Sequence, residues 1–256
     1  MLFTNTMFFG IDPTAGKLPF IFGAIDQDLN VMVIDKGPLD DVLAFAAAQR
    51  QAIVGVCAPR RPNQGLMADE ALRQSLTPIP NPGRWVDFRL VEYLLWQRNI
   101  RIPRTPASEE DCPRWMQNGF QLYQRLEALG YRAYPDEEAE RQYIEVYPHA
   151  SYCALLGVLP FAKRTLEGRL QRQLVLYEGR LRITDPMRIF EEITRYRLLN
   201  GILSTEGIFD QGELDALIAA YTAWQLMRTP ENSLLLGDPA EGQVALPVSS
   251  LNERYS

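Results

Sequence analysis

The chain has 256 residues, of which 46% are hydrophobic and 23% charged, with a net charge of -6 and a pI near 5.0. This length allows one large domain with a full core, and the composition is that of an ordinary globular protein. The acidic balance argues against broad electrostatic binding to nucleic acid, although a local basic patch can still bind phosphate.

Several classes of protein and site are excluded by simple patterns. No apolar run approaches the roughly 18 residues needed to span a membrane, and no basic region or cleavage site accompanies the N-terminal apolar residues, so we expect neither a membrane segment nor a signal peptide. Cys57, Cys112 and Cys153 are odd in number and widely spaced, which fits neither a disulfide framework nor a zinc site. We expect a cytoplasmic protein with reduced thiols.

The single histidine, His149, excludes multi-histidine metal sites and leaves only one imidazole for any acid–base scheme. We expect it to be structural. Carboxylates are therefore the expected carriers of any chemistry.

The apolar run at 7–11 ends in Asp12 and then breaks at Pro13. This pattern predicts a central strand, buried on both faces, that carries one carboxylate at its carboxyl end. An ionised carboxylate in apolar surroundings costs several kcal/mol unless a cation or hydrogen-bond donor meets it. We predict a divalent metal ion as the partner; the alternative is that Asp12 only caps the turn at Pro13 and Thr14.

The next predicted elements are strands over 18–26 and 30–35, a helix over 39–50 and a buried strand over 52–57. Short connections predict an antiparallel meander of the first three strands. The helix predicts a right-handed crossover that makes the fourth strand parallel to the first. Asp12 and Cys57 are then neighbours at the edge where sites form in α/β sheets.

Residues 58–141 have a different character, being rich in proline at first and then helical over 85–97 and 115–129. No strand pattern occurs in this segment. We predict one domain over 1–256 with a helical, proline-rich insertion at about 60–140 that packs on the sheet.

The remaining predicted elements are a strand over 142–147, a short helix capped by Ser151, a basic helix over 165–177, helices over 187–199 and 211–227, and an edge strand over 242–247. Asp210 and Glu213 predict a capping box at the start of the last helix. Asp215 lies one turn further, on the helix side made of small residues.

Asp12, Glu145 and Asp215 are each a carboxylate inside an otherwise apolar element. If they share a site they repel one another unless cations neutralise them, which suits Mg²⁺ or Mn²⁺. Two such ions could clamp a phosphodiester during hydrolysis.

Structural alternatives stand beside this interpretation. Glu145 could form a buried ion pair with Arg169 or Arg172, and Asp215 could simply be favoured by the positive end of its helix. The basic residues around Lys163 could be a solvated helix face.

Several segments together resemble a domain-of-unknown-function family of predicted nucleases with a ribonuclease H-like fold. They are GID at 10–12, VGVCAP at 54–59, EVYPHA at 145–150, KRTLEGRLQR at 163–172, DALIAA at 215–220 and EGQVALP at 241–247. The resemblance covers essentially the whole chain. It implies an α/β fold with a mixed five-stranded sheet, three antiparallel strands and then parallel strands, flanked by helices.

The resemblance implies catalytic and metal-binding roles, with Mg²⁺ or Mn²⁺, for the acids Asp12, Glu145 and Asp215. It also implies that substrate phosphate contacts the basic residues Lys163, Arg169 and Arg172. Cys57 departs from the family pattern, which has an aspartate there. A thiol is a softer ligand and is mostly protonated near neutral pH, so the site could hold one ion, be weakly active or be inactive.

We therefore expect a divalent-metal-dependent nuclease or phosphodiester hydrolase, with nucleic acid as the expected partner. A non-catalytic ribonuclease H-like binding or scaffolding module is the alternative. An actin-like ATPase half ranks last, because the chain is short and has no second Asp-Gly phosphate loop. The choice of DNA or RNA and the oligomeric state stay open.

Overall fold

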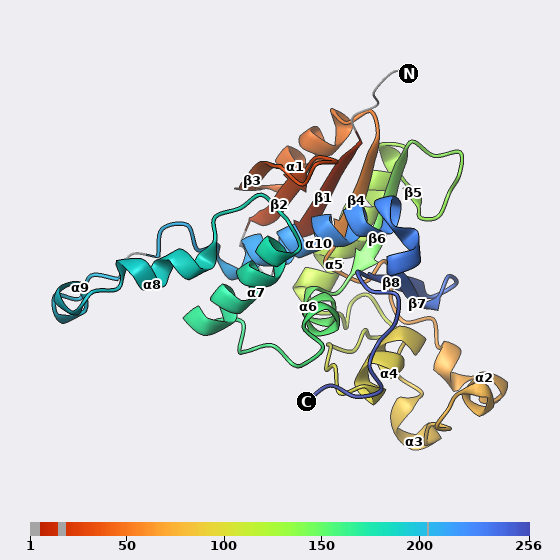
Figure 1. The fold of residues 1–256 in the computed structure, drawn as a ribbon. Helices are drawn as coiled ribbons and strands as arrows, with labels where there is room; N and C mark the ends of the chain where they lie inside the picture. The colour runs from red at the N-terminus through yellow and green to blue at the C-terminus, as the bar shows by residue number, and fades with distance from the viewer. Residues whose placement is uncertain (1–5, 15–18, 204) are drawn as a thin grey trace.

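The computed structural model describes residues 6–14, 19–203 and 205–256, which fold around an eight-stranded mixed sheet with helices on both faces (Figure 1). The strands are β1 (Met7–Asp12), β2 (Phe20–Ile25), β3 (Val31–Gly37), β4 (Ala52–Val56), β5 (Arg132–Ala133), β6 (Arg141–Val146), β7 (Leu234–Asp238) and β8 (Gly242–Leu246). Their order is β3-β2-β1-β4-β6-β8-β7, and β5 pairs with β6 outside this path.

The strand directions follow from the connections. The tightly connected β1, β2 and β3 pair antiparallel, whereas β1, β4, β6 and β8 pair parallel. Parallel neighbours need a crossover connection. The helix α1 (Leu39–Ala47), which lies between β3 and β4 in the chain, forms part of the crossover that makes β4 parallel to β1. The predicted meander and the predicted parallel pairing of the fourth strand with the first are therefore confirmed.

The sheet has more strands than the five that the resemblance implied. β5 has only two residues, too few to give a period-two pattern. The segment expected as an edge strand forms β8, which lies inside the sheet because β7 pairs antiparallel on its outer side. The order beyond β6 was not deducible from local pattern.

The other helices are α2 (Glu70–Ser75), α3 (Pro82–Trp85), α4 (Leu90–Gln97), α5 (Arg114–Ala128), α6 (Pro148–Leu156), α7 (Leu166–Glu178), α8 (Ile189–Glu192), α9 (Arg195–Leu199) and α10 (Gln211–Arg228). Short 3₁₀ helices are η1 (Leu66–Ala68), η2 (Pro186–Arg188) and η3 (Pro230–Asn232). None of the helices formed by the described residues combines the length and apolar character required to cross a bilayer.

Two predicted helices are interrupted. The helix expected over 187–199 breaks after α8, because Thr194 is extended and caps a new helix by accepting a hydrogen bond from the Arg197 backbone N–H. The helix expected over 85–97 likewise divides into α3 and α4, with Arg89 extended between them.

The helix α6 begins earlier than the cap at Ser151 that the sequence predicted. Its first residue is Pro148, which suits a first helical position because its missing N–H would have no helical acceptor there. Ser151 lies inside the helix and is buried.

The helix α10 crosses one face of the sheet over β1, β2 and β4 (Figure 1). Glycines make this contact close: a Cβ on Gly10 would lie 2.0 Å from the Ala216 carbonyl oxygen, and one on Gly55 would lie 2.6 Å from that of Ala219. Any side chain at these positions would force the helix off the sheet, so the backbones meet directly.

The opposite face of the sheet carries a second apolar cluster in which strand residues pack with α1 and α5. The strand side chains alternate between the two clusters: Phe9, Ile11 and Val54 face α1 and α5, whereas Phe8 and Ile53 face α10. This alternation decides where the carboxylates at the strand ends point.

Candidate functional site

Asp12 and Asp215 form the aspartate pair, between the end of β1 and the first turns of α10. The Asp12 carboxylate lies beside the start of the helix, where a Cβ on Gly212 would be 3.7 Å from Asp12 Oδ2. The Thr14 backbone N–H donates to Asp12 Oδ1 at 3.0 Å. The turn-capping role weighed as an alternative for Asp12 is therefore present.

Burial controls the electrostatics of the aspartate pair. It raises the pKa of Asp215 to about 7, a shift that nearby Lys163 opposes and the negative charge of Asp12 reinforces. It also raises the pKa of Asp12, against the effects of the Thr14 N–H and Lys163. Lys163 Nζ lies 3.7 Å from Asp215 Oδ2. One lysine thus acts on two carboxylates that are costly to ionise together.

Cys57 lies directly after β4, next to the aspartate pair. Its thiol is buried and donates a weak hydrogen bond to the Asp215 backbone carbonyl at 3.5 Å. Burial raises the pKa of the thiol well above its usual value, and the charges of Asp12 and Asp215 raise it further. The sulfur is therefore a neutral thiol at physiological pH, unlike the aspartate that the resemblance implies at this position.

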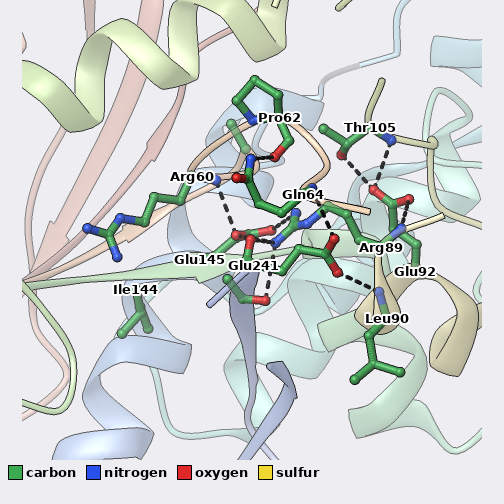
Figure 2. Close-up of polar contacts among 12 residues, drawn as sticks. Arg60, Pro62, Gln64, Arg89, Leu90, Glu92, Thr105, Ile144, Glu145 and Glu241 are labelled. Atoms are coloured by element: carbon green, nitrogen blue, oxygen red, sulfur yellow. Dashed lines mark hydrogen bonds and ion pairs between the residues drawn. The ribbon is translucent and has the colours of Figure 1, made fainter. Parts of the chain in front are cut away.

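Glu145 points to the other face of the sheet. It pairs in register with Val56, and Val56 with Ile11, whereas the preceding row is Gly10, Gly55 and Ile144 against α10. Because successive side chains alternate across a strand, Glu145 points away from α10. Figure 2 shows Glu145 and Ile144 directed to opposite sides of β6.

The Arg89 network consists of Arg89, Glu92, Glu145 and Glu241 (Figure 2). Arg89 donates to Glu145 through two nitrogens, at 2.6 and 3.0 Å, and the Arg60 backbone N–H donates to Glu145 at 3.2 Å. Arg89 also donates to the backbone carbonyls of Glu241 and Gly242. The ion pair weighed for Glu145 therefore exists, with Arg89 in place of Arg169 or Arg172.

The two remaining acids of the network satisfy backbone groups. The Glu241 carboxylate accepts hydrogen bonds from the backbone N–H groups of Gln64 and Leu90. The Glu92 carboxylate accepts from Arg89 N–H and from the N–H and hydroxyl of Thr105. Burial nevertheless outweighs these bonds and raises the pKa of Glu92 to about 7.

The three predicted phosphate contacts have different environments. Lys163 lies at the aspartate pair. Arg172 is buried and donates to the carbonyls of Phe161 and Gly168, so its guanidinium holds the preceding loop. Arg169 is half-buried on α7 and forms no ion pair or side-chain hydrogen bond with another described residue.

His149 lies 3.7 Å from the Cys153 sulfur, and burial lowers the pKa of His149 to about 4. The imidazole is therefore neutral at physiological pH. This environment agrees with the structural role expected for the histidine.

The sequence reading missed Arg89 and Glu241. The available signal for Arg89 was a lone cation immediately before the apolar run of α4, and for Glu241 an acid before β8. Neither pattern predicts that the two residues are in contact, because they are 152 positions apart in the sequence.

The aspartate pair offers two carboxylates to a cation. Within residues 6–14, 19–203 and 205–256, no group of three or more histidine, cysteine or acidic side chains has the arrangement of a metal site. Mg²⁺ commonly binds one or two carboxylates together with water and substrate phosphate. The donor set fits a single hard cation whose remaining ligands come from solvent and substrate.

The comparisons give a family and no characterised relative. A family model described as "Protein of unknown function (DUF429)" matches residues 10–241. Neither the search of the curated proteins nor that of the solved structures found a match.

Proposed function

The chain belongs to the DUF429 family, and on that premise we propose that it is a divalent-cation-dependent phosphodiester hydrolase of the ribonuclease H-like class, acting on nucleic acid. The observation that carries the proposal is the meeting of Asp12 and Asp215 beside Lys163 at the carboxyl edge of the parallel strands. Ligands bind at this edge in open α/β sheets.

The strand order supports the fold assignment within this proposal. The path β3-β2-β1-β4-β6 is antiparallel up to β1 and parallel from β1 onward. This is the arrangement expected of a ribonuclease H-like sheet. The strands β7 and β8 extend it beyond β6.

A cation at the aspartate pair would polarise a phosphodiester and make a bound water more acidic. Asp12 and Asp215 would supply two oxygen ligands, for which Mg²⁺ and Mn²⁺ are suited. The ammonium group of Lys163 is half exposed and can approach a substrate phosphate from the solvent side. We assign no ligand role to Glu145, because Arg89 already engages both of its oxygens.

The proposal is tested by Mn²⁺ binding and cleavage together. Mn²⁺ should stabilise the native protein, by about 2.7 kcal/mol at a hundredfold excess over Kd, and a panel of single-stranded, duplex and hybrid nucleic acids should reveal cleavage. Asp12→Asn and Asp215→Asn should abolish both effects. Asp28→Asn, an exposed aspartate in the β2–β3 turn, is the matched control and should abolish neither.

A non-catalytic binding or scaffolding module is the second candidate. It is favoured by the neutral, buried Cys57 thiol at the family's aspartate position. Under this alternative, Mn²⁺ leaves the melting temperature unchanged and no substrate on the panel is cleaved. Stabilisation by Mn²⁺ without cleavage of any substrate would support the cation site but contradict the hydrolase function.

A further inference from the structure

The segment 186–203 forms an arm that projects from the rest of the molecule, with α8 along it and α9 at its tip (Figure 1). Its large apolar side chains are unusually exposed. Leu199 is 80% exposed and Tyr196 72%. The other exposed apolar residues of the arm are Met187, Phe190, Leu198, Ile202 and Leu203.

The base of the arm is held firmly. Gln173 on α7 is fully buried, and its amide nitrogen donates to the Thr184 carbonyl at 3.0 Å and the Gly207 carbonyl at 2.7 Å. Its amide oxygen accepts from the Phe209 N–H at 2.9 Å. The Gln173 side chain therefore links the segments that lead into and out of the arm to α7, so hydrogen bonds fix the position of the arm's base.

The exposed apolar area is large enough for a stable interface. Taking roughly 200 Å² for a fully exposed large side chain, the exposed fractions of these residues correspond to on the order of 800 Å². A standard interface buries about 800 Å² per partner. Apolar patches of this size on a protein surface mark interaction sites.

The charges on the arm favour a second copy of the same chain as the partner. The arm's acids Glu191 and Glu192 nearly balance its arginines Arg188, Arg195 and Arg197, and Asp185, immediately before the arm, completes the balance. A balanced patch lacks the excess positive charge by which nucleic acid and anionic membranes attract proteins.

The charge order is also self-complementary. Glu191 lies on α8 and Arg195 on α9, both are exposed, and neither has an ion-pair partner within the described parts of the chain. Only the neighbouring Glu192 and Arg197 pair within the arm, at 3.4 Å. In a two-fold interface, contact of residue i with j implies contact of j with i, so one acid and one base on each arm yield two cross-pairs.

We propose that the arm is a homodimerisation element, in which arms from two copies of this chain pack their apolar residues about a two-fold axis with Glu191 of each facing Arg195 of the other. The pairing is independent of the hydrolytic function proposed above. It gives the arm's apolar residues the covering that the chain itself does not provide.

The mass of the full chain in solution tests the proposal, by sedimentation or light scattering over a range of concentrations. The unmodified protein should be a dimer. Leu199→Glu should raise the dimer dissociation constant at least about 30-fold, as expected for a central interface residue. Met32→Glu, at a 57% exposed apolar residue on β3, is the control and should leave the constant unchanged. Because both side chains are exposed, circular dichroism should show intact folds.

A charge exchange tests the two-fold pairing itself. Glu191→Arg and Arg195→Glu should each weaken the dimer, because like charges then face each other twice. An equimolar mixture of the two variants should restore it, because both cross-pairs are again of opposite charge. A monomeric unmodified protein, a dimer insensitive to Leu199→Glu, or no recovery in the mixture would each overturn the proposal.

Discussion

Asp12 and Glu145 lie toward the same edge of one sheet, near the carboxyl ends of β1 and β6, yet they have different surroundings. Arg89 engages both oxygens of Glu145, and the Arg60 backbone N–H supplies a further hydrogen bond. Asp12 shares its region with Asp215, and Lys163 acts on both. A one-residue difference in register decides which face, and hence which partners, a carboxylate meets.

These surroundings distinguish a carboxylate with a structural role, Glu145, from the carboxylates of the aspartate pair, which are candidates for a functional role. In the Arg89 network, protein groups satisfy Glu145 and Glu241 and link the segment between β4 and β5 to β6 and β8, and Glu92 alone keeps a raised pKa. In the aspartate pair, the cost of ionisation is incompletely relieved, which leaves a use for an added cation. Perturbed acids of this second kind are candidates for functional sites.

The largest effect is expected from Arg89→Met. The variant leaves Glu145 buried without its cation, which should cost about 3–5 kcal/mol of unfolding free energy. Urea denaturation at pH 7 measures this loss. Arg104→Met, which removes an exposed ion pair with Asp87, should change stability by less than about 1 kcal/mol. Equal losses of stability in Arg89→Met and Arg104→Met would contradict the structural role of the buried Arg89–Glu145 ion pair.

A pH effect of the next size should come from Glu92. The pKa of Glu92 in the folded protein, raised from 4.5 to about 7, exceeds its value in the unfolded chain. The contribution of protonated Glu92 to the free energy of unfolding is therefore fully present below about pH 4.5 and is lost as the pH rises through 7. The loss should be on the order of 3 kcal/mol. Glu92→Gln cannot titrate, so the stability difference from the unmodified protein should grow in favour of the variant between pH 5 and 8. A difference constant with pH would contradict the shift.

Asp215→Asn should have an effect of similar size, also of stabilising sign. Because the pKa of Asp215 is about 7, its ionised form is unfavourable above that pH. Without divalent ions, the stability of the variant relative to the unmodified protein should rise by on the order of 2–3 kcal/mol between pH 5 and pH 8. Thermal unfolding at both pH values measures this, with Asp28→Asn as the control. A loss of stability at pH 8 would show that the charge of Asp215 is already compensated.

The smallest effect is expected from Lys163→Met. Its ion pair with Asp215 is half exposed on the lysine side, so its removal should cost less than about 1 kcal/mol. The informative result is a further rise in the pKa of Asp215, measured by NMR titration of the carboxyl carbon. Arg164→Met, at the exposed neighbouring position, should not move that pKa.

Local signals predicted much of the fold. The apolar run of β1, the crossover helix α1 and the capping box of α10 at Asp210 and Glu213 depend on neighbouring residues, and all three are confirmed. The Thr194 cap that divides α8 from α9 is also local, but the apolar pattern through it suggested one continuous helix.

The candidate site was less predictable, because it depends on faces and distant partners. Glu145 has apolar neighbours on both sides, since β6 is buried on both faces, so the pattern does not indicate where its side chain points. Its partner Arg89 comes from the segment between β4 and β5, 56 positions earlier. Asp12 and Asp215, by contrast, were placed together through elements whose contact the small residues of α10 anticipated.

The glycine contact between α10 and the sheet would bear on ion choice at the cation site proposed above. Backbone atoms of the helix rest on Gly10 and Gly55, so the separation of the Asp12 and Asp215 main chains is fixed by hard contact. Two ligands held at an inflexible spacing discriminate among cations by radius. Mg²⁺ demands near-ideal octahedral geometry at about 2.0–2.1 Å, whereas Ca²⁺ accepts looser, longer coordination. The stiffness of this contact would thus make the spacing of the two main chains a determinant of cation size.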